Sequence, residues 1–125
     1  MKRFAAHYIF LREEKIYKQH YLELDENNLI TGVFPLENEI AGTVFHNGIL
    51  FPVSKALNLQ PSIILDSLKT LSLQYPEDSI SQLLQRTGLI SEENIPAQIF
   101  QLDGIDLFLL RFFDQKISPS IQKIN

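Results

Sequence analysis

Three histidines are the residues of this sequence best suited to bind a metal ion or to move a proton near neutral pH: His7, His20 and His46. None of them belongs to a His-x-His or His-Glu-x-x-His pattern, which would place two imidazoles beside one metal ion. Each lies alone in a predicted strand or turn. The sequence therefore favours surface or hydrogen-bonded core histidines, and we predict no catalytic residue, no metal ligand and no cofactor site.

Carboxylates and nucleophiles give no stronger signal. The adjacent pairs Glu13-Glu14 and Glu92-Glu93 point their side chains apart on either a helix or a strand, so we expect solvated surface. The absence of cysteine excludes disulfides, thiolate zinc sites and cysteine nucleophiles. The sequence has neither a glycine-rich phosphate loop nor the Gly-x-Ser-x-Gly turn of a hydrolase nucleophile.

One segment resembles a DNA-binding helix-turn-helix in its apolar spacing and its turn glycine: Ser79–Leu89 followed by Ser91–Ile95. A recognition helix needs cations for the phosphates, whereas this one would carry Glu92 and Glu93 and end at Pro96. The net charge of the chain is −4, which gives no general attraction to nucleic acids or anionic membranes. We expect no nucleic-acid partner.

The length of 125 residues predicts a single domain spanning residues 1–125. Apolar residues make up 45% and charged residues 21%, values typical of a soluble globular protein. No segment approaches the roughly 18 consecutive apolar residues of a membrane span. The apolar stretch after Met1 contains His7 and is followed by Arg12–Lys15, so we expect a first strand rather than a secretion signal. These features predict a cytoplasmic protein without a membrane partner.

Before Pro52 the sequence predicts strands joined by turns. The strands are expected at Lys2–Leu11, Tyr17–Leu24, Leu29–Phe34, Ile40–Phe45 and Ile49–Phe51, with turns at Asp25–Asn28 and His46–Gly48 and a bulge at Gly32. Strict alternation assigns the second strand two faces, which are Tyr17, Gln19, Tyr21 and Glu23, and Lys18, His20, Leu22 and Leu24. Leu22 and Leu24 make the second face the more apolar one, so we expect them to point inward.

After Pro61 the period becomes helical, and near the C-terminus it returns to strands. A helix near Ser62–Tyr75 has an apolar stripe formed by Ile64, Leu68, Leu71 and Tyr75. A shorter helix near Ser79–Arg86 is predicted with Asp78 as its N-cap and Gly88 as its stop. The remaining expected elements are strands at Gln98–Leu102, Ile105–Phe113 and Ile117–Ile124, with a turn at Asp103-Gly104. Pro119 is tolerable only at an edge, so the last strand is expected there.

The N-terminal segments resemble the opening of a metal-dependent amidohydrolase of the cytosine deaminase and chlorohydrolase type. The resemblance is carried by Ala6–Ile9, Leu22–Asp25, Leu29–Val33 and Ile40–Pro52. The second half resembles the other end of the same family, through Leu65–Leu71, Tyr75-Pro76, Ser79–Leu84, Phe100–Leu107 and Ser118–Ile124. The resemblance covers most of the chain, in two blocks that meet between Pro52 and Ile63. In that family the two chain ends assemble a β-sandwich beside a catalytic barrel.

The resemblance implies an α+β fold: a β-rich sandwich, the composite domain of metal-dependent hydrolases, built from the N-terminal and C-terminal strands with two short helices in the middle. It also implies that strands before Pro52 share a sheet system with strands after Ala97. The family's metal-binding His-x-His would fall on Asn58 and Gln60, and neutral amides are poor ligands for zinc or iron. The barrel strands that carry the remaining ligands have no counterpart in this sequence.

We therefore expect a non-catalytic, amidohydrolase-related protein, a truncated paralogue that lacks the barrel and the metal ligands and serves as a protein-interaction or structural module. The alternative is a hydrolase-related subunit that contributes His7, His20 or His46 to a metal site in trans. The expected partner is a protein or a second copy of this chain. The reason is that Ile105–Phe113 carries more apolar area than one sandwich face can bury.

The sequence makes a prediction about catalysis. Purified protein is expected to show no divalent-metal-dependent deamination or amide hydrolysis above background, because no ligand cluster is available to lower the pKa of a bound water. The measurement is turnover of amide and aminopyrimidine substrates with added zinc or iron, with and without a chelator. Turnover that disappears both with the chelator and with His46→Ala would overturn the prediction.

Overall fold

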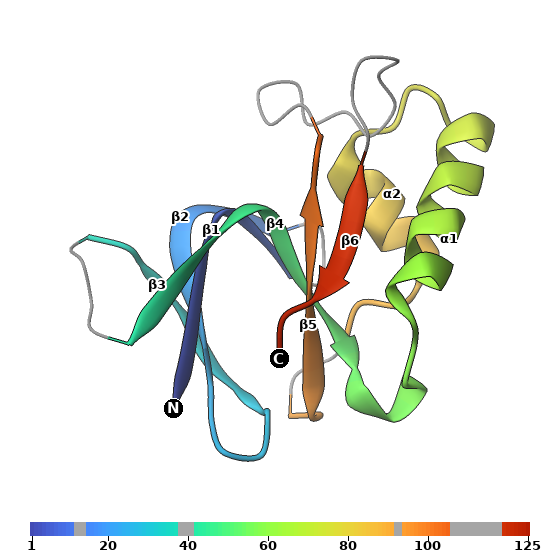
Figure 1. Ribbon diagram of the computed structural model, residues 1–125. Helices are drawn as coiled ribbons and strands as arrows, with labels where there is room; N and C mark the ends of the chain where they lie inside the picture. Colours follow the sequence, from blue (N-terminus) through green and yellow to red (C-terminus); the bar gives the residue numbers. More distant parts are fainter. Residues whose placement is uncertain (12–14, 38–41, 92–93, 106–118) are drawn as a thin grey trace.

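The chain forms one curled sheet with two helices against part of one face, in a computed structural model that describes residues 1–11, 15–37, 42–91, 94–105 and 119–125 (Figure 1). The elements are β1 (Lys2–Leu11), β2 (Lys15–Leu24), β3 (Ile30–Pro35), β4 (Thr43–Ser54), the short 3₁₀ helix η1 (Lys55–Leu57), α1 (Pro61–Gln74), α2 (Ile80–Thr87), β5 (Ala97–Asp103) and β6 (Ser120–Lys123). Within the described residues the strand order is β3-β2-β1-β4-β5-β6. Strands β1 and β4 pair in parallel, and the other neighbours are antiparallel.

The predicted α+β, strand-rich fold is confirmed, whereas a sandwich is not. Strands from both ends of the chain share one sheet, as expected, because β4 pairs with β5 from Ile49↔Leu102 to Ser54↔Ala97. The six strands of the described chain belong to this single mixed sheet rather than to two stacked sheets. In Figure 1 the helices lie on one side of β4–β6, and β1–β3 curl away from them.

Each face of the sheet carries its own apolar core. On the first face, here called the helix face, strand residues such as Phe10, Phe51 and Phe100 pack with Ile64 and Leu68 of α1, and Phe51 and Phe100 stack at 6.0 Å. The opposite face, here called the inner face, has a second core, whose buried members among the described residues all come from strands: Phe4, Ala6, Ile9, Leu22, Leu24, Leu50, Ala97 and Ile99. A flat sheet would expose that face, so the curl of the strands is what buries it.

Hydrogen bonds hold the curl closed where the β2–β3 turn meets the start of β5 and the C-terminal residue. The amide of Ala97 donates to the carbonyl oxygen of Asn28 at 2.9 Å. The side-chain amide of Asn125 donates to Ala97 O at 3.2 Å and to Asn28 Oδ1 at 3.3 Å, and its Oδ1 accepts from Ile99 N at 2.6 Å. The contacts of Asn125 to Ile99 and Ala97 span 26 and 28 positions, whereas the contact of Asn125 to Asn28 spans 97 positions, and such long-range closure is costly in chain entropy.

The predicted strands Lys2–Leu11, Tyr17–Leu24 and Leu29–Phe34 are confirmed as β1, β2 and β3, and so is the turn at Asp25–Asn28. Of the predicted strand Ile40–Phe45, residues 40 and 41 lie outside the described residues. Leu22 and Leu24 are fully buried, as expected. Asp25 builds the predicted turn by accepting from the amides of Asn27 and Leu29 at 2.8 and 3.0 Å, and Asn28 takes the left-handed conformation at φ 62°. The pairing of β2 with β3 shifts register beside Gly32, which agrees with the predicted bulge.

The predicted turn at His46–Gly48 is wrong, because this segment lies inside the continuous strand β4. Asn-Gly instead produces a bulge: β1 advances two residues from Ala6 to Tyr8 while β4 advances three, from His46 to Ile49. Gly48 takes φ 91° there, a conformation that glycine tolerates best. The apolar run that follows is buried between both cores, and this burial keeps β4 in the sheet.

Both helices lie where the sequence predicts them. Pro61 occupies the first turn of α1, Ile64 and Leu68 are buried, and Gly88 ends α2 in the left-handed conformation at φ 67°. The predicted N-cap Asp78 is wrong by one residue. Ser79 caps α2 in a capping box with Gln82.

The remaining predictions concern the C-terminal part of the chain. The described part of the predicted edge strand Ile117–Ile124 is confirmed as β6, which lies at one edge of the sheet that the described residues form. Of the predicted strand Ile105–Phe113, Ile105 is buried and residues 106–113 lie outside the described residues. Within Ser91–Ile95 the described positions are not helical, so the helix-turn-helix pattern gains no second helix there. The helices that the structure describes are all too short and too polar to cross a membrane.

The bulge at Gly48 predicts a large stability loss on substitution. In Gly48→Ala the new Cβ would lie 2.1 Å from the carbonyl oxygen of Leu102, so backbone must move, and we expect a loss of about 3 kcal/mol or more. Gly88→Ala is the matched control, because its φ is also positive but no atom lies within 4 Å of its Cβ, and we expect about 1 kcal/mol. Urea unfolding measures both, and equal losses would contradict the account.

Candidate functional site

The most unusual backbone of the sheet is a pair of irregularities that face each other on β1 and β2. Ala6 and Ile9 both belong to the inner core although they are three residues apart, so His7 and Tyr8 both lie on the helix face. On β2, Gln19 has a left-handed φ of 57°, and the rings of Tyr17 and His20 on either side of it are 5.1 Å apart. At this position of the sheet, two consecutive residues of β1 and two consecutive residues of β2 therefore lie on the same face.

This arrangement corrects the alternation predicted for β2. Tyr17 and His20 share a face, whereas strict alternation separates them. Lys18 and Gln19 consequently both lie on the helix face, beside His7 and Tyr8. Leu36, just beyond β3, donates its amide to the carbonyl oxygen of Gln19 at 2.9 Å, which holds the following segment against β2.

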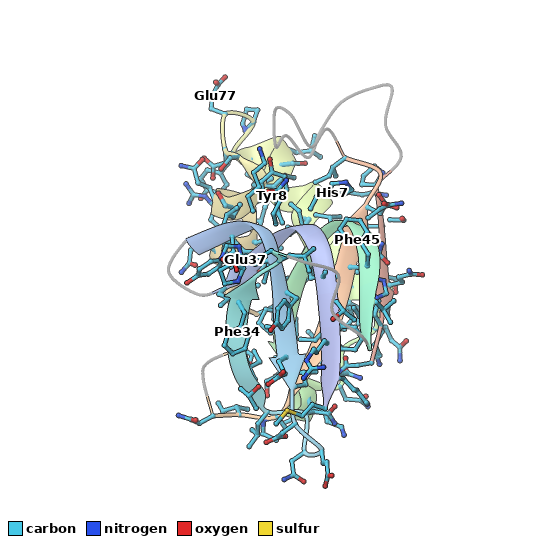
Figure 2. All side chains as sticks on the ribbon, turned by 90° about the vertical axis from the view of Figure 1, so that its left-hand side faces the viewer. His7, Tyr8, Phe34, Glu37, Phe45 and Glu77 are labelled. Carbon is cyan, nitrogen blue, oxygen red and sulfur yellow. The ribbon has the colours of Figure 1, made fainter. Side chains whose placement is uncertain are left out.

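These residues line a pocket of about 530 Å³ beside His7. Its other lining residues are Ala6, Tyr8, Lys18, Gln19, Leu36 and Phe45. The rings of His7 and Phe45 meet edge to face at 5.2 Å, and Figure 2 shows the two side chains next to each other. The volume lies within the range of ordinary small-ligand sites.

A backbone contact fixes the hydrogen-bonding character of His7. The amide of Gly48 donates to His7 Nδ1 at 3.2 Å, so this nitrogen must carry a lone pair. In the neutral imidazole the proton therefore lies on Nε2, which makes His7 a hydrogen-bond donor through its remaining nitrogen. The bulge thus sets both the position and the tautomer of this side chain.

An aromatic row, here defined as Phe45, Ala5, Tyr21 and Phe34, crosses the same face next to the pocket. The four residues are register partners on β4, β1, β2 and β3. Tyr21 and Phe34 lie 5.3 Å apart, and Ala5 between the larger side chains is only 1% exposed. At the two ends of the row, Phe45 is 53% exposed and Phe34 is 39% exposed. This part of the helix face is therefore apolar and accessible to a partner.

A polar row borders the aromatic row one step along the strands. Arg3 Nε donates to Glu23 Oε2 at 2.9 Å, and Thr31 Oγ1 donates to Glu23 Oε1 at 2.8 Å. The hydrogen bonds from Thr31 and then from Arg3 lower the pKa of the Glu23 carboxyl from its ordinary value. Both carboxylate oxygens of Glu23 thus accept hydrogen bonds from within the chain. We therefore do not assign Glu23 a role in binding a ligand.

The three histidines are not brought together. His20 and His46 are both register partners of Ala6, from opposite sides, so β1 separates them by two strand spacings, roughly 10 Å. His20 Nδ1 donates to the carbonyl oxygen of Lys18 at 2.8 Å, and His46 lies against Phe4 with ring centroids 5.8 Å apart. Among the described residues no group of three His, Cys, Asp or Glu side chains could hold a metal ion. The metal site in trans therefore gains no support and stays a prediction.

Asn58 and Gln60, where the resemblance would place metal-binding histidines, lie at the ends of two helices. Asn58 follows η1 in the left-handed conformation at φ 47°, and Gln60 precedes the first turn of α1 as its N-cap residue. Both side chains are exposed.

A second hollow of about 510 Å³ lies between the two helices, beside Asp66, Thr70 and Arg86. Its cation is already engaged, because Arg86 bonds Asp78 and lies 3.5 Å from the centroid of the Tyr75 ring. The Asp78 hydrogen bond raises the pKa of Arg86. The His7 pocket is therefore the stronger candidate site.

The chain has no match among family models, curated proteins or solved structures. The resemblance to amidohydrolases accordingly stays a prediction, and the site must be interpreted from its own chemistry.

His46 predicts a pH dependence of stability. Its Nε2 is buried without a hydrogen-bond partner in the described chain, and burial lowers the pKa of the imidazole below 6.5. The unfolded chain then binds more protons between the folded pKa and 6.5, so stability is lost as the pH falls below about 6.5. Chemical unfolding between about pH 7.5 and about pH 5.5 measures this loss.

His46→Gln should remove this component, and the control His20→Gln should keep it, because the ring of His20 is already hydrogen-bonded at the surface. Identical pH profiles for the wild type and His46→Gln would contradict the assignment.

Proposed function

We propose that this chain is a non-catalytic protein-interaction module that binds a second copy of itself through the aromatic row. The observation that carries the proposal is the exposure of Phe45 and Phe34, two large apolar side chains at opposite ends of one row on a rigid sheet. Burying the exposed half of each ring in an interface contributes roughly 1 kcal/mol per side chain. The origin of the module as a truncated relative of amidohydrolases is part of the same proposal.

The size of the face sets the strength of the association. It spans the four strands β3-β2-β1-β4. With about five residues along each strand, at about 4.8 Å between strands and about 3.4 Å per residue, the face covers on the order of 300 Å². Stable interfaces bury about 800 Å² on each partner. We therefore expect a weak dimer, with a dissociation constant on the order of 100 μM.

Charge favours a second copy over an unrelated partner. Lys18 beside the pocket and Glu37 just beyond β3 carry opposite charges at the border of this face, and neither forms an ion pair among the described residues. Figure 2 shows Glu37 toward the same side of the sheet as Phe34, with Phe45 toward the other side. A two-fold arrangement would place Lys18 of one copy near Glu37 of the other, and each such pair would occur twice.

The test is the oligomeric state of aromatic-row variants. Sedimentation velocity of the wild-type chain from about 10 μM to about 500 μM should show a shift from monomer to dimer. The double variant Phe34→Ser, Phe45→Ser should remain monomeric throughout, because both ends of the row are lost.

Leu73→Ser is the matched control, since Leu73 is a 73% exposed apolar residue on α1, away from the row. It should dimerise like the wild type. A wild-type chain that stays monomeric at the highest concentration, or a dimer that survives in the double variant, would overturn the proposal.

A further inference from the structure

The His7 pocket combines apolar walls with hydrogen-bond donors from two neighbouring strands. The aromatic ring of Phe45 and the aliphatic side chain of Leu36 supply apolar surface. His7 offers Nε2–H, because Gly48 occupies its other nitrogen. Lys18 adds an ammonium group, and Gln19 adds a side-chain amide. Among the described lining residues none carries a carboxylate.

The backbone that builds this pocket is strained. The strain lies at Gln19, whose φ of 57° costs a non-glycine residue roughly 1–2 kcal/mol, whereas Gly48 on the other side of β1 adopts φ 91° without that cost. Regular strands would send His7 or Tyr8, and Lys18 or Gln19, to the inner face, and the donors would be divided between the two faces. The irregular backbone therefore places the hydrogen-bond donors of β1 and β2 on the same face, around one pocket.

We infer that this pocket binds a small apolar carboxylate, an aromatic or branched acid whose anionic end meets Lys18 and His7 Nε2–H while its apolar body lies against Phe45 and Leu36. Charge-assisted hydrogen bonds from an ammonium to a carboxylate are about twice as strong as neutral ones, so the charge of the ligand decides the selectivity. A cationic ligand would meet Lys18 unfavourably. A divalent metal ion would find a single imidazole without a carboxylate in the described lining.

Glu37, the described carboxylate next in sequence to a lining residue, limits where the anion can sit. Glu37 follows Leu36 directly, is exposed, and is not among the residues that line the pocket. The carboxylate of the ligand is therefore placed at the His7 and Lys18 end, with the apolar body toward Leu36. This inference does not depend on the proposed dimer, because it concerns a hollow within one copy.

The experiment is an NMR titration with 2-naphthoate and with its neutral counterpart 2-naphthamide, at a protein concentration below that of self-association. The carboxylate should shift the amide resonances of Gly48 and Phe45 and the ring resonances of His7. It should bind at least about tenfold more tightly than the amide, a difference of about 1.4 kcal/mol. Lys18→Met should reduce the affinity for 2-naphthoate to that of 2-naphthamide.

Two further variants test whether 2-naphthoate binds in this pocket or to any exposed lysine side chain. Lys55→Met, which removes another exposed lysine at η1, should leave 2-naphthoate binding unchanged. Phe45→Ser should lower the affinities for 2-naphthoate and 2-naphthamide by a similar factor, because it removes apolar surface from the pocket and leaves the charge of Lys18 in place. Equal affinities for the acid and the amide, an unchanged affinity in Lys18→Met, or no binding of either ligand would each overturn the inference. Failure of dimerisation would not affect it.

Discussion

Closure of the curled sheet is the constraint on which the rest of the structure depends. Among the described residues the helices contribute to the core of the helix face and not to the inner core, so the inner core is buried by the approach of the two ends of the sheet. The hydrogen bonds of Ala97 and Asn125 to Asn28 hold that approach. The same curl turns the part of the helix face that is formed by β1–β3 and the first residues of β4 away from α1 and α2, and it thereby leaves Phe34 and Phe45 exposed.

Local sequence signals predict most elements because short-range physics decides them. The apolar stripe through Ile64 and Leu68, the left-handed stop at Gly88 and the turn at Asp25 all depend on residues within a few positions of each other. The inward direction of Leu22 and Leu24 follows from alternation for the same reason. Strand pairing between the two chain ends was expected from a family resemblance, and the pairing of β4 with β5 confirms it.

The candidate site could not be predicted, because it arises where alternation fails. By itself, Asn47-Gly48 predicts a turn. It forms a bulge inside β4 because the residues that follow it are buried in both cores. Nothing local marks Gln19 as left-handed, since its conformation depends on β1 beside it. The histidine pattern gives no sign of the contact from Gly48 that sets the tautomer of His7, because this contact joins positions 41 apart.

The central claim is that the uncovered half of the helix face is a binding surface. Hydroxyl-radical footprinting at low and high protein concentration tests it most directly, because it reports the solvent exposure of individual side chains. The account predicts that oxidation of Phe34 and Phe45 falls as the concentration rises, while oxidation of Leu73 and Tyr75, which are also exposed, stays constant. Unchanged oxidation of Phe34 and Phe45, or an equal decrease at all four side chains, would contradict it.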